Sequence, residues 1–273
     1  MKFLNIMTVA SISFAFNIMP YGAYVNYSNK ALKDNAYVAG IYASFFKSPF
    51  KFEFDAEATK ITYKDNTPEW NQQDLTAVVN YYKGYNFAYK IGIHNIFINQ
   101  NGNKDDYDKV FFLGMLYYKY LKYNVGIDIF YSMYDGFNVT QLSPKIGFNF
   151  GNYYSPEGSF YFEARLNQIH ISNSNQTPHQ DYTNLDFKLQ NFKGPWVTTL
   201  KGNFGRNAYK VDNGGFVVYN LGNEYKYSVG LKVNYSLNTY SSVGIGYSVS
   251  NYKLNIGGNA HSSTVVVEYS RAF

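Results

Sequence analysis

The chain has 273 residues, of which 20% are aromatic and only 16% are charged, well below the ~25% charge of a typical soluble domain. It contains no cysteine, which excludes disulfides, thiolate metal sites and cysteine nucleophiles. The mean hydropathy is −0.33 and the net charge of +5 forms no stripe of Lys and Arg, so neither a helical membrane protein nor a nucleic-acid-binding protein is expected.

The N-terminus has the composition of a secretory signal peptide. Lys2 supplies a positive charge, and residues 3–16 form an apolar stretch with a few polar interruptions. We predict a leader over residues 1–23, with cleavage after Ala23 or after Ala15. Such a leader implies export across the inner membrane.

The remaining residues, 24–273, are predicted to form one domain of strands in which short connections alternate strictly with longer, more polar ones. Transmembrane β-barrels show this alternation, because their turns are short on one side and their loops longer on the other. Thirteen connections give fourteen strands, or twelve if a first strand near residues 22–28 does not form. The short connections are residues 47–49, 83–85, 120–122, 152–158, 191–195 and 238–241; the longer ones are residues 29–35, 64–72, 99–107, 135–138, 172–181, 210–215 and 257–262.

Within the predicted strands, apolar and polar residues alternate with a period of two. In the segment that begins at Phe50, for example, apolar residues alternate with Lys51, Glu53, Asp55 and Glu57. A soluble sandwich has the same period, but its strands are usually about five or six residues long, whereas ten or more are expected here. The predicted fold is therefore all-β: a single transmembrane, antiparallel, up-and-down β-barrel.

The last ten residues read as a strand with one apolar face. Val265, Val267, Tyr269 and Phe273 lie on that face, together with Arg271. This end resembles the closing strand of bacterial outer-membrane β-barrels, in which a terminal Phe after alternating apolar residues is read by the assembly machinery. Arg271 departs from the apolar or aromatic residue usual there. The resemblance implies a porin-like barrel in the bacterial outer membrane, with the lipid bilayer and the barrel assembly machinery as partners; the alternative is an edge strand of a soluble sandwich.

The polar faces of the strands would line the lumen of such a barrel. Their bases and acids nearly balance, so no strong ion selectivity is predicted. The acids Glu53, Asp55 and Glu57 form a ladder that bases such as Arg165 would oppose, giving a transverse field that favours small polar solutes; the alternative is a set of structural ion pairs filling a narrow barrel. The pore-lining candidates are Lys51, Glu53, Asp55, Glu57, Lys90, Asp128, Glu163, Arg165, Asp186, Lys188, Lys201, Glu224, Lys226, Lys232 and Glu268.

One short motif suggests an enzyme instead. His170, Ser172 and the later Asn184 have a spacing that resembles the outer-membrane phospholipase A family, whose triad faces the lipid. The resemblance implies His170 as base, Ser172 as nucleophile and Asn184 as the residue that orients the His. The family's Gly-Arg after this motif is missing, and Asn184 falls in the inward phase of its strand.

Taken together, the pattern favours an outer-membrane channel, or porin, for passive diffusion of small polar solutes. The alternatives are the lipid hydrolase and a closed barrel whose loops bind a surface partner. No cofactor and no metal are predicted, because His94, His179 and His261 have no ligand partners at close spacing.

Overall fold

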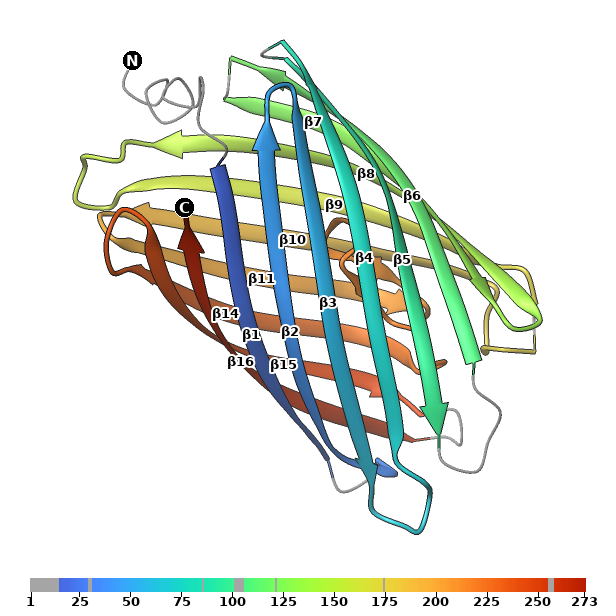
Figure 1. The fold of residues 1–273 in the computed structure, drawn as a ribbon. Helices are drawn as coiled ribbons and strands as arrows, with labels where there is room; N and C mark the ends of the chain where they lie inside the picture. Colours follow the sequence, from blue (N-terminus) through green and yellow to red (C-terminus); the bar gives the residue numbers. More distant parts are fainter. Residues whose placement is uncertain are drawn as a thin grey trace.

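The computed structural model describes residues 15–28, 31–84, 86–100, 106–120, 122–173, 175–254 and 258–273. Fourteen antiparallel strands form one closed barrel, and the first and last strands pair with each other (Figure 1). No helix in these residues is long and apolar enough to cross a membrane. The strands are β1 (Ala15–Tyr27), β2 (Lys33–Lys47), β3 (Phe50–Tyr63), β4 (Trp70–Lys83), β5 (Phe87–Gln100), β6 (Asp106–Lys119), β7 (Tyr123–Tyr134), β8 (Phe137–Gly151), β9 (Ser159–Ile171), β10 (Asp181–Lys193), β11 (Trp196–Asn207), β14 (Glu224–Ser236), β15 (Ser241–Lys253) and β16 (Asn259–Ala272).

The period-two pattern places apolar side chains on the outer face of the barrel. Phe54, Ile91 and Ile245 are among the large apolar residues exposed there, while Asp55, between Phe54 and Ala56, is buried on the inner face. Aromatic pairs ring the end of the barrel that holds Phe273; examples are Phe87 with Tyr117, Phe150 with Phe160, and Trp196 with Tyr235. The predicted all-β barrel of fourteen strands is therefore confirmed.

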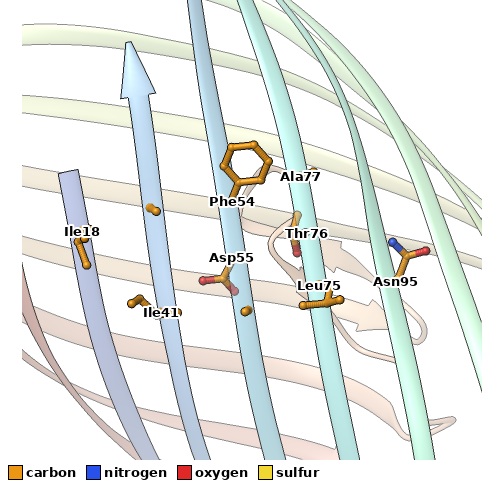
Figure 2. A pocket seen from close by; sticks show the side chains of 10 residues that line it. Ile18, Ile41, Phe54, Asp55, Leu75, Thr76, Ala77 and Asn95 are labelled. Carbon is orange, nitrogen blue, oxygen red and sulfur yellow. The ribbon is translucent and has the colours of Figure 1, made fainter. Parts of the chain in front are cut away.

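An apolar hollow of about 390 Å³ lies in the outer face across β1 to β5 (Figure 2). It is surrounded by the larger side chains of Ile18, Ile41, Phe54 and Leu75. The hollow forms because the small side chains of three alanines lie between them. Such a surface fits hydrocarbon chains better than it fits a polar solute.

The barrel closes through β1, which begins earlier than predicted. It spans Ala15–Tyr27 rather than residues 22–28, because its first half also pairs with β2 and β16. The backbone N–H of Phe273 donates to Phe16 O at 2.8 Å. Residues 1–14 of the predicted leader lie outside the described residues, and the leader stays a prediction.

The connection between β11 and β14 turns into the barrel instead of forming the predicted outer loop at residues 210–215. It carries the two-residue strands β12 (Val211–Asp212) and β13 (Val217–Val218), joined by the 3₁₀ turn η1 (Asn213–Gly215). Figure 1 shows this hairpin, in orange, inside the ring of strands. We call residues 208–223 the plug segment. It folds inward because Val211 completes an apolar cluster on the inner face, formed by Val78, Val110, Phe112 and Phe130.

Candidate functional site

The plug segment is held to the inner wall by hydrogen bonds to its backbone. Gln141 on β8 binds Val211 twice: its Nε2 donates to Val211 O, and its Oε1 accepts from Val211 N, both at 2.8 Å. Lys90 Nζ on β5 donates to Gly214 O at 3.0 Å, and His94 Nδ1 lies 3.1 Å from Gly215 O. Because buried backbone groups are costly to leave unpaired, these wall side chains fix the hairpin in one position.

Gly215 is needed where the plug segment touches the wall most closely. Its φ is 110°, a conformation that side-chain-bearing residues rarely adopt. A Cβ at this position would lie 2.3 Å from the ring of Phe112 on β6. Glycine at position 215 is therefore required twice, by the positive φ and by the close contact with Phe112 on β6.

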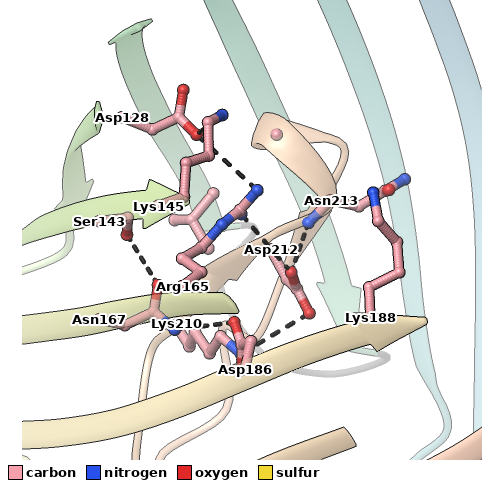
Figure 3. A network of polar contacts seen from close by, with 12 residues as sticks. Asp128, Ser143, Lys145, Arg165, Asn167, Asp186, Lys188, Lys210, Asp212 and Asn213 are labelled. Atoms are coloured by element: carbon pink, nitrogen blue, oxygen red, sulfur yellow. Dashed lines mark hydrogen bonds and ion pairs between the residues drawn. The ribbon is translucent and has the colours of Figure 1, made fainter. Parts of the chain in front are cut away.

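A network of ion pairs surrounds the hairpin (Figure 3). Buried Asp128 on β7 lies 3.0 Å from Lys90 Nζ, 2.6 Å from Lys145 Nζ and 3.9 Å from the Arg165 guanidinium. Arg165 also reaches Asp212 of the plug segment at 4.0 Å. One carboxylate of the wall is thus surrounded by three cations, and two of these cations, Lys90 and Arg165, also contact the plug segment.

A second part of the network joins the plug segment to β10. Lys210 Nζ donates to Asp186 Oδ1 at 2.6 Å and lies 3.7 Å from Asp212. Removal from bulk water would raise the pKa of the Asp212 carboxyl, but Lys210, Arg165 and Lys201 together hold this pKa well below its usual value. Asp212 is therefore an anion across the neutral range.

The predicted acidic ladder exists, but its partners differ from the prediction. Tyr21 OH on β1 lies 2.9 Å from Asp55 and 2.8 Å from Glu57, and Glu53 is bound by Lys51 at 2.8 Å. Arg165, the predicted opposing base, instead contacts Asp128, Glu163 and Asp212. Within the described residues, Lys51 pairs with Glu53, the neutral Tyr21 holds Asp55 and Glu57 by hydrogen bonds, and Arg165 forms no ion pair with the ladder.

The two sides of the inner face differ in their access to water. Beneath the plug segment, on β5 to β8, inward residues such as His94, Val110, Phe130 and Gln141 are buried. On the opposite side, the middle sections of β14, β15 and β16 present inward residues that are mostly small or polar and are partly exposed. We call this surface the solvated wall; it comprises Ser228, Gly230, Lys232, Gly244, Gly246, Ser248, Thr264, Val266 and Glu268.

Apolar clusters fill the interior near the end of the barrel opposite the termini. One cluster joins Val139, Ile169 and Ile171 to Tyr209 of the plug segment. Another, built around Tyr252 and Ala260, includes Tyr27 and Tyr225. The solvated wall is thus covered toward this end by aromatic side chains.

The remaining pore-lining candidates lie at the edges of this arrangement. Glu224 is buried beside Arg206 at 3.7 Å and His179 at 3.9 Å. Lys226 sits at a bulge in β14, and its Nζ donates to Asn259 at 2.7 Å. Lys232 pairs with Glu268 at 2.5 Å on the solvated wall. A pore-lining role for the set stays a prediction, as does the assembly-signal role of Val265, Val267, Tyr269 and Phe273, which are exposed on the outer face or at the end of the chain.

The structure does not assemble the predicted His-Ser-Asn triad. His170 Nδ1 pairs with Asp181 at 2.8 Å on the exposed surface, and Ser172 Oγ accepts from the backbone N–H of Asn138. Asn184 is buried on the inner face, where it accepts from Asn167 and Asn203. The base and its predicted orienting residue therefore lie on opposite faces of the barrel wall.

Several residues of the site were absent from the sequence-based set. Lys145 and Lys210 complete the ion-pair network, and Tyr21 bridges the acidic ladder. The alternation in β8, where Gln141, Ser143 and Lys145 are polar at every second position, is the signal that could have revealed Lys145. No local signal marks Lys210, because its partner Asp186 is 24 residues away in the chain.

No protein-family model matches the chain, and neither does a curated protein. Solved structures do match. The CymD monoaromatic hydrocarbon channel superposes with a TM-score of 0.66 at 9% identity, covering 99% of this chain and 92% of that one. The toluene transporter TbuX of Ralstonia pickettii gives a TM-score of 0.59 at 8% identity, with 96% and 90% covered. A FadL homologue of Pseudomonas aeruginosa gives 0.53 at 11% identity, with 96% and 90% covered.

At such low identity, these similarities establish the fold alone. They agree with the closed barrel of fourteen antiparallel strands, and the predicted fold is confirmed. By its fold, the chain is a closed β-barrel of the kind seen in these solved structures.

Proposed function

We propose that the protein is an outer-membrane channel in which small polar solutes pass along the solvated wall, beside the plug segment. The observation that carries the proposal is the exposure of Lys201 and Lys232, whose side chains belong to the inner face of a closed barrel. A lysine on an inner face reaches solvent only if water occupies the lumen. The bilayer would surround the outer face, and the terminal strand would be the signal for the barrel assembly machinery.

The composition of the solvated wall supports a polar solute. Glycines and hydroxyl-bearing residues such as Ser248 and Thr264 leave room and offer hydrogen bonds, while the nearby Lys232–Glu268 pair adds charge. The opposite wall is filled by the plug segment, so the free cross-section is a crescent and not the full lumen. We infer that the plug segment limits the conductance.

A second candidate is an apolar solute. The solved structures named above include a monoaromatic hydrocarbon channel and a toluene transporter, and aromatic side chains such as Tyr27, Tyr225 and Tyr252 cluster inside the end opposite the termini. A route along this cluster would suit an aromatic ring. The charged lysines of the inner face favour the polar solute.

The test is conductance in a planar bilayer of the refolded barrel and of a variant in which residues 208–223 are replaced by a short Gly-Ser turn. This deletion leaves the barrel ladder intact, because the plug hairpin pairs only with itself. We expect ion conductance from the wild-type barrel and a several-fold larger one from the deletion variant.

The control is a variant with residues 65–68 shortened, which alters an outer connection and leaves the lumen unchanged. Heat-modifiable mobility on gels would show that each variant is folded. If both barrels fold and neither conducts, the polar channel is wrong. Toluene flux without ion conductance would establish the second candidate, and a barrel with neither activity would favour a surface-binding role.

A further inference from the structure

Three lysines occupy neighbouring positions on the inner face, beside the plug segment. Lys188 on β10 lies directly opposite Lys201 on β11, and Lys201 lies opposite Gly230 on β14. Lys232 follows Gly230 at the next inward position of the same strand. We call Lys188, Lys201 and Lys232 the lysine row; it crosses three adjacent strands and ends on the solvated wall.

The stability of the sheet does not explain the lysine row. Like charges directly opposite each other on one face of an antiparallel pair are destabilising. Lys201 also forms no ion pair with any residue that the structure describes, although it is exposed to the lumen. Lys201 contributes to the field that lowers the pKa of Asp212, but no ion pair within the described residues fixes its ammonium group, which therefore stays available to a solute in the passage.

The acids that pair with Lys188 and Lys232 are less exposed to the lumen than the lysines themselves. The side chain of Lys188 is 28% exposed, whereas its partner Glu163, 3.6 Å away, is 17% exposed. Lys232 is 37% exposed, and its partner Glu268 only 8%. The water-filled space therefore meets the ammonium groups first, although the sequence contains nearly equal numbers of inward acids and bases.

Two other acids face this space and must be weighed. Asp212 on the plug segment is 37% exposed, but Lys210 at 3.7 Å and Arg165 at 4.0 Å surround it. Glu57 on β3 is half-buried, and its carboxylate is bound by Tyr21. The charge of Asp212 is thus balanced by cations, to which Lys201 also contributes, and the Glu57 carboxylate accepts a hydrogen bond from a neutral phenol. Lys201 forms no ion pair of its own within the described residues.

We infer that the lysine row is an anion-binding track, so that the passage proposed above selects small anions such as carboxylates and phosphates over cations. This inference rests on the proposed channel and differs from the expectation of weak selectivity. Incoming anions would lose part of their hydration and gain charge-assisted hydrogen bonds from three successive ammonium groups. Because the row spans several strands, an anion could move from one lysine to the next.

The first test measures the local potential without requiring conduction. The chain has no cysteine, so Ser248→Cys places a single thiol next to Gly230, whose Cβ would lie 2.9 Å from that of Ser248. The reaction rate of this thiol is measured with two methanethiosulfonates, the anionic sulfonatoethyl reagent and the cationic trimethylammonioethyl reagent. The rate ratio is the anionic rate divided by the cationic rate. The anionic reagent should be favoured, and the rate ratio should fall roughly fivefold or more when Lys188, Lys201 and Lys232 are replaced by Gln.

The matched control is Lys60→Gln, which removes a lysine whose ion pair with Glu69 is exposed. It should leave the ratio unchanged. If the triple variant does not fold, Lys201→Gln alone serves, because it breaks no ion pair. A ratio that favours the cation, or that does not respond to these substitutions, would overturn the inference.

The second test is the reversal potential across a tenfold KCl gradient. Chloride preference in the wild-type barrel, lost in the Gln variant and reversed in Lys201→Glu, would support the track. Conductance that prefers potassium would overturn it. If the thiol reactivity depends on the lysine charges but the barrel never conducts, the anion-binding role of the lysine row is supported and the proposed channel is rejected. Failure of the inference and failure of the proposed channel are therefore distinguishable.

Discussion

At the scale of single residues, the interior is organised by carboxylates that each hold several donors. Asp128 lies against three cations and is only 1% exposed. Its position also requires Gly114 on the neighbouring strand, since a Cβ there would lie 2.2 Å from Asp128 Oδ1. Desolvated charges are tolerated only when their partners are in place.

Asp128→Asn should therefore be strongly destabilising, because the largely buried cations Lys90, Lys145 and Arg165 would be left with one less anion. We expect a loss of about 3 kcal/mol or more in the free energy of unfolding. The measurement is urea unfolding in lipid vesicles, followed by tryptophan fluorescence. Glu69→Gln, which breaks only the exposed pair with Lys60, should cost less than about 1 kcal/mol. Equal losses in the two variants would contradict this account.

At the scale of elements, the strands were predictable and the plug segment was not. The period of two in segments such as Phe50–Tyr63 distinguishes the two faces locally, so the sequence reveals which side chains point inward. An inward-folded connection depends on contacts distant in the chain, such as Val211 with Gln141, which no local pattern shows. The apolar residues Val211, Phe216 and Val218, which pack together in the structure, were the signal in the sequence that this connection avoids water.

The plug segment should detach in acid. The pKa of Asp212 is lowered in the docked state, so its contribution to attachment is complete above the ordinary carboxyl pKa of about 3.9 and is lost progressively as the pH falls from there toward the lowered pKa. Val211→Cys reports docking, because Val211 is buried. Its reaction with dithiodipyridine, which proceeds in acid, should accelerate below about pH 4.

In Asp212→Asn, the same thiol should already react quickly at neutral pH, because Lys210 and Arg165 lose their partner on the hairpin. Asp65→Asn, in the connection between β3 and β4, is the control and should not change the rate. A Val211→Cys rate independent of both pH and Asp212 would show that the apolar cluster alone holds the plug segment.

At the scale of the whole molecule, the inner face and the plug segment depend on closure of the barrel by the pairing of β1 with β16. β1 meets β16 in one register from Asn17 opposite Ala272 to Tyr27 opposite Ser262, with Met19 and Pro20 outside the pairing. An open edge in a bilayer would leave backbone groups without partners, each costing several kcal/mol. The two ends of the described chain also meet, since the rings of Phe16 and Phe273 are 6.1 Å apart.

This closure favours one of the two predicted leader cleavage sites. Cleavage after Ala23 would remove more than half of β1, including Tyr21 and its bonds to Asp55 and Glu57, whereas cleavage after Ala15 would leave the pairing from Phe16 onward. We therefore expect residues 16–273 to refold into a heat-modifiable barrel and residues 24–273 to fail. Mass spectrometry of the protein from outer membranes should find Phe16 as the first residue. Equal refolding of both lengths would mean that β16 closes on β2 without the first half of β1, and the barrel would then be complete without the Tyr21 bridge.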